Sequence, residues 1–299
     1  MSEILVGIDG SAGAKDALAF AKQLAAITGA GLRLANAFPY DDIRTRASNE
    51  TFRDVLRTDS DALLAGMDGG DVARDAVADT SPAHALHKLA EEHNASLMIV
   101  GSTHRGRVGC VMPGSTGERL LHGSLCPVAI VPQGYAADDR PLRTIGVGYD
   151  GSDESEAALS TATELARRVG ATVRVIRVFD ATEIGTPALM TGPGWVAIRS
   201  DLETRQREQL ERRVAEQPSD VAVEPVFCLG SPNRELATQS ETVDLMVMGS
   251  RGYGPLHAVL LGGVTHAVVR KAACPVIVLP RGARNGLGTL LAPAAEATA

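Results

Sequence analysis

The sequence predicts an α/β fold made of two duplicated domains, each an open five-stranded parallel sheet with helices on both faces. Three observations predict this class. The 299-residue chain divides into two similar halves. Each half alternates short runs rich in β-branched residues with longer stretches of helical periodicity. Each half also places glycines directly after a strand-like run, where open α/β sheets bind ligands. We expect the two copies to pack as a pseudo-twofold pair.

The internal repeat is the most informative large-scale feature. Residues 4–38, ILVGIDGSAGAKDALAFAKQLAAITGAGLRLANAF, align without gaps with residues 145–179, IGVGYDGSDESEAALSTATELARRVGATVRVIRVF. A period of more than 140 residues indicates a duplicated domain, because short-repeat solenoids have periods of about 20–50 residues. The repeat predicts domains at residues 1–133 and 143–282, a polar, turn-rich boundary near residues 133–143, and a flexible tail at residues 283–299.

Ten strand-like runs alternate with helical stretches, five in each half. In the first half they lie at residues 3–9, 31–38, 71–77, 96–101 and 127–132, and in the second half at residues 144–150, 172–179, 221–227, 245–249 and 275–280. The helical pattern of residues 154–170 stops at Gly170, which is typical of a helix C-terminus. Parallel strands need long crossover connections and burial of both faces, so this alternation predicts a parallel sheet between two helical layers.

Composition excludes several function classes. The formal net charge is −7 and no dense Lys/Arg run is present, which argues against nucleic acid or an anionic membrane as partner. No apolar run approaches the roughly 20 residues of a membrane-spanning helix. The four cysteines, Cys110, Cys126, Cys228 and Cys274, lack zinc-site spacing, and no signal-like segment is evident at the N-terminus. We therefore expect a cytoplasmic protein in which Cys126 and Cys274 are buried apolar residues.

Residues 247–263, VMGSRGYGPLHAVLLGG, contain five glycines between a strand-like run and a helix-like run: Gly249, Gly252, Gly254, Gly262 and Gly263. A glycine inside an element costs about 0.5–1 kcal/mol relative to alanine, so such a cluster needs a backbone reason. Backbone N–H groups and a helix N-terminus would converge there on a phosphate. The sequence therefore predicts an anion site at the carboxyl edge of the sheet, with ordinary tight turns as the alternative.

Other motifs carry less information. Residues 146–151, GVGYDG, match GxGxxG, but these glycines run through a strand and the first copy lacks the first of them, so a dinucleotide site is not expected. No P-loop is present. His84, His87 and His93 could approach a metal, but a solvated helix face is favoured because no further ligand has matching spacing. We therefore predict no metal ligand and no catalytic residue.

With these features the chain resembles the tandem form of the universal stress protein family over nearly all of residues 1–282. ATP-binding members of that family carry a Gly, two residues, Gly, nine residues, Gly and then Ser or Thr. The second copy has Gly249, Gly252, Gly262 and then Gly263, and so lacks the hydroxyl. The first copy has Gly101, His104, Gly114 and then Ser115, and so lacks the second glycine. The resemblance implies a Rossmann-like domain of the nucleotide-binding α-hydrolase type.

The resemblance also implies ATP as the ligand, with or without Mg²⁺, and assigns roles by position. Asp9 and Asp150 would contact ribose, Ala37 and Val178 would contact adenine, and Val100 and Met248 would form the opposite wall. Ser115 and Thr116, or Val264 and Thr265, would offer donors to phosphate. His104 either supplies a donor in place of the missing glycine or fills the loop. Each aspartate, in a DGS triplet, could instead form an Asx turn that caps the following helix, and the two roles could coexist.

Two function classes remain open at this stage. The first is an ATP-binding regulatory or stress-response module with little or no turnover, because the loops lack the lysine and Mg²⁺ ligands of phosphoryl-transfer enzymes. The second is a nucleotide-free interaction protein whose loops keep structural roles, and a slow ATPase is a third alternative. We expect both copies to bind nucleotide, and the second copy to be the occupied one if only one is, because His104 puts a side chain into the first loop. The protein partner is not identified, and a homodimer of two-domain chains is a further expectation.

Overall fold

All ten predicted strands are present in the structure, a computed structural model. It describes residues 2–40, 50–103, 111, 113–124, 126–137, 140–183, 193–250, 261–281 and 287–291. The strands are β1 (Glu3–Gly7), β2 (Gly31–Phe38), β3 (Ala73–Ala78), β4 (Leu97–Gly101), β5 (Val128–Val131), β6 (Thr144–Gly148), β7 (Thr172–Phe179), β8 (Val223–Leu229), β9 (Leu245–Gly249) and β10 (Val276–Leu279). They form one sheet in the order β3-β2-β1-β4-β5-β10-β9-β6-β7-β8.

Helices connect these strands, and one more follows the last strand. They are α1 (Ala12–Thr28), α2 (Glu50–Ala65), α3 (Pro82–Glu92), α4 (Ser115–Gly123), α5 (Asp153–Val169), α6 (Pro193–Ala215), α7 (Pro232–Gln239), α8 (Gly263–Val269) and α9 (Leu287–Leu290). The repeat reproduces the caps as well as the helices. Ser11 and Ser152 cap the N-termini of α1 and α5 with their side chains, and Gly29 and Gly170 end the same helices in the left-handed conformation. The predicted helix end at Gly170 is confirmed.

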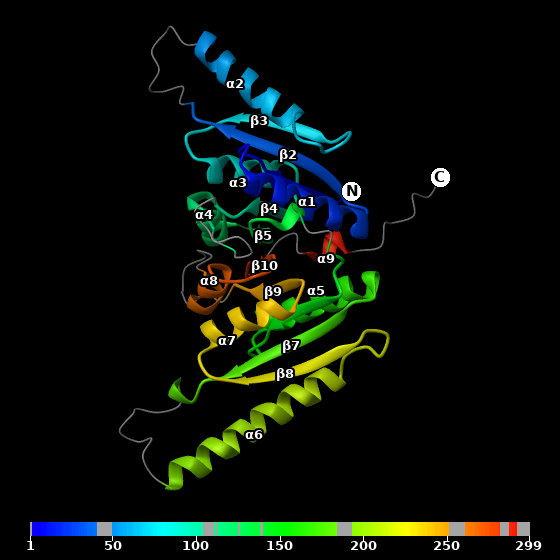
Figure 1. Cartoon of the computed structure of the whole chain (residues 1–299), viewed down its shortest axis with the longest axis vertical. Coiled ribbons are helices and arrows are strands. Elements are labelled where there is room, and N and C mark those ends of the chain that lie inside the picture. Colours follow the sequence, from blue (N-terminus) through cyan, green and yellow to red (C-terminus); the bar gives the residue numbers. More distant parts are fainter. Residues whose placement is uncertain are drawn as a thin grey trace.

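The two domains join through their last strands. Within each domain every strand pairing is parallel, whereas β5 and β10 pair antiparallel, with Ala129 opposite Ile277. The strand order of domain two therefore repeats that of domain one in reverse, which confirms the predicted pseudo-twofold pair. β5 and β10 lie in the middle of the molecule and α2 and α6 at its two ends (Figure 1). The pairing covers two apolar strand edges that would otherwise be open to other chains.

An apolar core covers each face of the sheet. One core contains buried residues of α1, α2, α5, α6 and α9, and the other contains buried residues of α3, α4, α7 and α8. Both cores include residues from both domains. β5 and β10 are buried along their whole length, as expected for strands in the centre of a sheet with helices on both sides. The domains therefore share their cores as well as their sheet.

Helix packing requires the first glycine of each loop. A β-carbon on Gly101 would lie 2.0 Å from the carbonyl oxygen of Gly13, in the first turn of α1. A β-carbon on Gly249 would lie 2.6 Å from Cβ of Glu154, in the first turn of α5. No larger residue fits either position without moving a helix. The sequence pattern predicts an anion site near these glycines but gives no sign of this contact between backbone and helix.

The segment after β5 is anchored to α1. The buried carboxylate of Asp16 accepts hydrogen bonds from the backbone N–H groups of Gly134 (2.9 Å) and Ala136 (2.7 Å). The ring of Tyr135 packs edge-on against Phe20, and its hydroxyl donates to Gln23. The start of the interdomain segment, expected to be polar and turn-rich, is thus tied to domain one.

Part of the C-terminal tail also packs. Leu287, Leu290 and Leu291 are buried in the same core as α5, and Arg168 donates a hydrogen bond to the carbonyl of Leu291. The sequence predicts a flexible tail at residues 283–299. The leucines of this short segment bury apolar surface against domain two, which gives it a reason to stay folded. Residues 292–299 lie outside the described residues.

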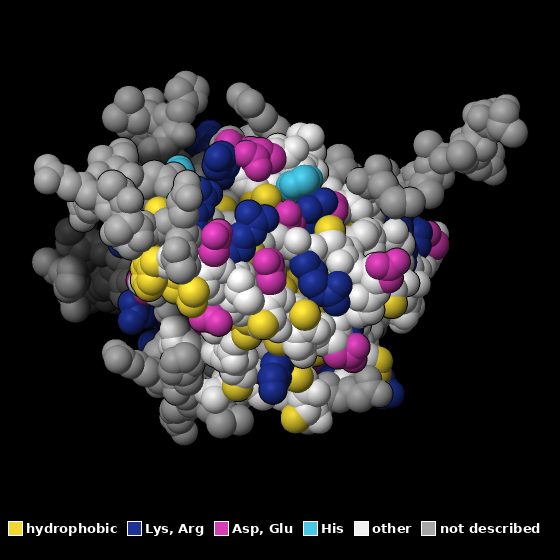
Figure 2. All heavy atoms as spheres, turned by 90° about the horizontal axis from the view of Figure 1, so that it is seen from above, with side chains coloured by type: hydrophobic (Ala, Val, Ile, Leu, Met, Phe, Trp, Pro, Cys, Tyr) yellow, Lys and Arg dark blue, Asp and Glu magenta, His cyan; other side chains and the backbone are white. Residues whose placement is uncertain are grey.

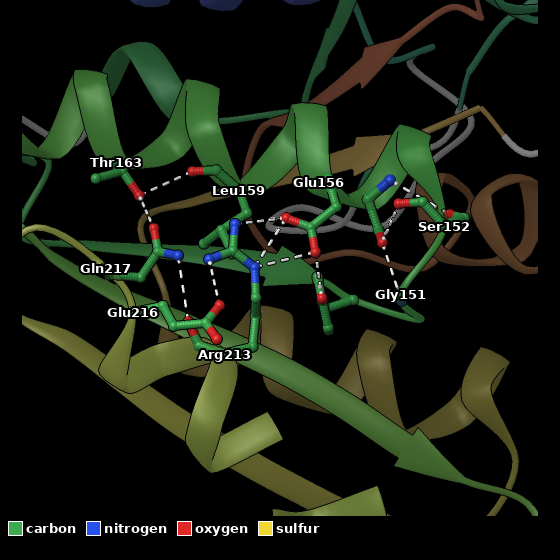
Figure 3. A network of polar contacts seen from close by, with 10 residues as sticks. Gly151, Ser152, Glu156, Leu159, Thr163, Arg213, Glu216 and Gln217 are labelled. Carbon is green, nitrogen blue, oxygen red and sulfur yellow. Dashed lines mark hydrogen bonds and ion pairs between the residues drawn. The ribbon is translucent and has the colours of Figure 1, made fainter. Parts of the chain in front are cut away.

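A polar network fixes α6 on α5 in domain two. Arg213 lies between Glu156 and Glu216, with its Nη2 2.7 Å from Oε2 of Glu156 (Figure 3). Glu156 also accepts a hydrogen bond from the hydroxyl of Tyr149. Hydrogen bonding from Arg213, opposed by burial, holds the pKa of Glu156 below its ordinary value. In the repeat, domain one has Ile8 in place of Tyr149, so the hydrogen bond from the tyrosine hydroxyl has no counterpart at that position.

The surface mixes the two signs of charge. On the face at the α2 end, Lys and Arg side chains alternate with Asp and Glu (Figure 2). Such a mixture gives that face no broad field of one sign. Among the helices that the structure describes, none is both long enough and apolar enough to cross a membrane.

Candidate functional site

A cavity of about 340 Å³ opens at the carboxyl ends of β1, β2 and β4 in domain one. Its size is within the usual range for small-molecule sites. β1 lies between β2 and β4, where the strand order of domain one reverses, and ligands of open α/β sheets bind at such a point. Its lining comprises Gly7, Ile8, Asp9, Ser11, Ala14, Ala35, Asn36, Ala37, Pro82, Leu86, Val100, Gly101, Ser102, Thr103, Gly114, Ser115, Thr116 and Gly117.

The structure brings the predicted domain-one residues together around this cavity. Asp9, Ala37, Val100, Gly101, Gly114, Ser115 and Thr116 all line it. They come from four separate parts of the chain, which the parallel sheet gathers at one edge. The remaining predicted residue of domain one, His104, lies outside the described residues.

Small apolar side chains form one end of the cavity. Ala35 and Ala37 lie at the end of β2, Val100 lies at the end of β4, and Leu86 of α3 lies against them. The alanines leave room that a larger side chain at the strand end would fill. An apolar slot of this kind suits a flat aromatic ring.

Asp9 forms the Asx turn that the sequence analysis gives as an alternative to a ribose contact. Its Oδ1 accepts hydrogen bonds from the backbone N–H (3.0 Å) and hydroxyl (2.5 Å) of Ser11, which in turn caps α1. Asp150 and Ser152 repeat the arrangement at 2.9 and 2.5 Å. Because Asp9 is exposed and also lines the cavity, the turn leaves its carboxylate available to a ligand hydroxyl.

The other end of the cavity is polar and is made by the start of α4. Its N-cap residue is Gly114, which has no side chain to accept a bond from the first-turn N–H groups. Ser115 and Thr116 add two hydroxyl groups to these backbone donors. Among the described lining residues, Asp9 has the only charged side chain. An anion at this end would therefore be held by backbone and hydroxyl donors and by the helix dipole.

Sequence reasoning missed Asn36, which also lines the cavity. Its Nδ2 donates to the carbonyl of Ile8 and its Oδ1 accepts from the hydroxyl of Ser60, both at 2.6 Å. Asn36 thus connects the end of β1 to α2. Asn36 could have been recognised from the sequence as a polar residue beside Ala37 at the end of a buried strand, where a polar side chain needs a hydrogen-bond partner.

Domain two has different side chains at several matching positions. Asp150, Val178, Met248, Gly249, Gly262, Gly263, Val264 and Thr265 are described, whereas Gly252 lies outside the described residues. The buried hydroxyl of Thr265 donates to the carbonyl of Gly249 at 2.9 Å, which ties the first turn of α8 to the end of β9, and its role as a phosphate donor stays a prediction. A β-carbon on Gly263 would meet nothing within 4 Å, so the missing hydroxyl has room there.

The fold and the cavity define a duplicated α/β protein with a cleft at the carboxyl edge of the sheet in domain one. The chain belongs to the universal stress protein family, whose profile matches residues 1–132 and 141–280. The matched ranges follow the two halves of the sheet.

Relatives and solved structures agree with this membership. Universal stress protein Rv2005c of Mycobacterium tuberculosis (strain ATCC 25618 / H37Rv) is 30% identical over 200 residues, which cover 67% of this chain and 66% of that protein, just under two thirds of its length. Rv2319c of the same strain is 30% identical over 220 residues, covering 71% of this chain and 74% of that protein. The crystal structure of a universal stress protein from Archaeoglobus fulgidus DSM 4304 has a TM-score of 0.66 at 20% identity, covering 94% and 98% of the two chains, and supports the fold.

Proposed function

We propose that this chain binds an adenine nucleotide in the cleft of domain one and uses it as a regulatory ligand. The observation that carries the proposal is the cleft itself, with an apolar slot at one end and the uncapped first turn of α4 at the other. Adenine would lie against Ala37 and Val100, ribose beside Asp9, and phosphate at Ser115 and Thr116. Membership of a family that often binds adenine nucleotides supports the same ligand.

The proposal gives the nucleotide little or no turnover. Fast phosphoryl transfer needs cations on the transferred group and a residue that orients water. The described lining of the cleft has no lysine or arginine, and its one carboxylate, Asp9, accepts hydrogen bonds from Ser11. A nucleotide that persists can shift an equilibrium between two states of the protein if its affinity differs between them. The alternative is a nucleotide-free interaction protein, which would keep the same fold and leave the cleft without a ligand.

Thermal unfolding with and without ATP tests the proposal on the full chain, after any co-purified nucleotide has been removed. A ligand at 100 times its Kd stabilises the folded state by about 2.7 kcal/mol. For a chain of this length, that corresponds to a rise in Tm of roughly 4 °C. No shift with ATP, ADP or AMP at millimolar concentration would refute the proposal and favour the nucleotide-free alternative.

Asp9→Asn and Asp150→Asn form a matched pair for calorimetry. Asparagine keeps an oxygen for the Asx turn, so the cap of the following helix is preserved while the carboxylate charge is lost. We expect Asp9→Asn to weaken ATP binding about tenfold or more, as expected for hydrogen bonds to a charged group. Asp150→Asn reports whether domain two contributes a second site. Unchanged affinity and stoichiometry in the Asp9 variant would refute the assignment of ribose to domain one.

A further inference from the structure

A negative charge follows directly after the proposed phosphate site. Gly114 to Gly117 line the cleft, and the next residue of α4 is Glu118, whose backbone N–H donates to the carbonyl of Gly114 at 2.9 Å. Side chains three or four residues apart on a helix lie on one face, with β-carbons about 5–6 Å apart. A phosphate bound at the start of α4 would therefore lie about one helical turn from Glu118, on the same face of the helix. Alone, the Glu118 carboxylate would oppose the binding of an anion.

Domain two supplies the compensating charge. Nη1 of Arg270, at the end of α8, lies 3.4 Å from Oε1 of Glu118, and Nε2 of His266 lies 4.0 Å from the same oxygen. In the repeat, Glu118 aligns with His266 and His122 aligns with Arg270. The pseudo-twofold arrangement therefore places α4 against its own counterpart, and the two helices lie side by side (Figure 1).

Backbone contacts hold the two helices in this position. The N–H of Leu261, just before the glycine pair of domain two, donates to Nδ1 of His122 at 3.4 Å. The N–H of Val111 donates to the carbonyl of Ala272 at 2.7 Å. An exposed ion pair is usually weak because two flexible side chains must be ordered to form it. Here the helices that carry Glu118 and Arg270 are already fixed relative to each other.

We propose that Arg270 of domain two sets the charge at the phosphate end of the domain-one cleft. By neutralising Glu118, it lets the helix N-terminus attract phosphate and makes domain one favour phosphorylated adenosine over adenosine. Arg270 is a positioning residue in this role because it acts through Glu118. The side chains of Glu118 and Arg270 are 38% and 50% exposed, so the effect is screened by salt. The inference rests on the proposed function, since it concerns the same cleft.

The test compares the Kd of ATP with the Kd of adenosine in full-length protein carrying Asp150→Asn, which removes the proposed ribose contact of domain two. Adding Arg270→Ala should weaken ATP binding about three- to tenfold at low ionic strength and leave adenosine unchanged, because adenosine carries no charge. Adding Glu118→Gln to Arg270→Ala should restore ATP affinity. The loss should shrink at 0.5 M salt. Arg174→Ala serves as the control, because Arg174 pairs with Glu224 on β7 and β8, at the far side of domain two.

Equal weakening of ATP binding and adenosine binding would overturn the inference, because a structural role of Arg270 would change the affinity for both ligands. An unchanged ATP affinity in Arg270→Ala, or a failure of Glu118→Gln to restore it, would overturn it as well. Absence of ATP binding in the parent protein would instead refute the proposed function, and this inference with it.

Discussion

Replacement of Gly101 by alanine tests whether this glycine serves the fold apart from any ligand. The added β-carbon would lie 2.0 Å from the carbonyl oxygen and 2.3 Å from the carbonyl carbon of Gly13. Both are backbone atoms, so no side-chain rotation can relieve the contact, and α1 must move away from β4. Overpacking in a core costs about 1–3 kcal/mol, and we expect Gly101→Ala to lie at or above the upper end of that range.

Urea unfolding of the nucleotide-free protein, followed by circular dichroism, measures this cost. With an m-value of about 3 kcal/mol/M, a loss of 3 kcal/mol lowers the urea midpoint by roughly 1 M. Gly263→Ala is the matched control, because a β-carbon at Gly263 has open space around it. Its midpoint should stay within about 0.2 M of the parent protein.

The reasoning would be refuted if Gly101→Ala unfolded at the midpoint of the parent protein while losing only its affinity for ATP. That outcome would mean that the glycine is needed for approach of the ligand alone. A lowered midpoint without nucleotide supports packing of α1 on β4 as the reason.

Two further predictions concern titratable groups. Hydrogen bonds from Arg213 lower the pKa of Glu156, so the stability that Glu156 contributes is present above the ordinary glutamate pKa and is lost as the pH falls through the lowered pKa. Glu156→Gln should therefore flatten the decline of the urea midpoint between pH 6 and pH 3. An unchanged slope would contradict this. Burial raises the pKa of Cys126 to about 11 and raises that of Cys274 further, whereas Cys228 is half-buried. In the native protein at pH 8, maleimide should therefore label Cys228 at least about tenfold faster than Cys126 or Cys274, as mapped by mass spectrometry, and equal rates would show that the two buried thiols are accessible.

Local patterns were enough to predict the two domains and their strands. The β-branched run at residues 172–179, the glycine at Gly170 that ends a helix and the repeat of the DGS triplet all act over a few residues, so they can be recognised without the tertiary structure. Packing of the two copies as a pseudo-twofold pair was predicted as well. The cleft residues Asp9, Ala37, Val100 and Ser115 were also predicted, because carboxyl ends of parallel strands meet at one edge.

Contacts between distant segments could not be predicted in the same way. The approach of α1 that requires Gly101, the hydroxyl of Thr265 bonded to Gly249, and the packing of Leu287 each depend on which backbone atoms come close after folding. The ion pair between Glu118 and Arg270 joins two domains, and no local pattern links those positions. Sequence by itself determined the elements and the residue types at the cleft, because propensity and periodicity are local. Tertiary structure alone decided which atoms of those residues already have partners, because packing and hydrogen bonding are made between elements.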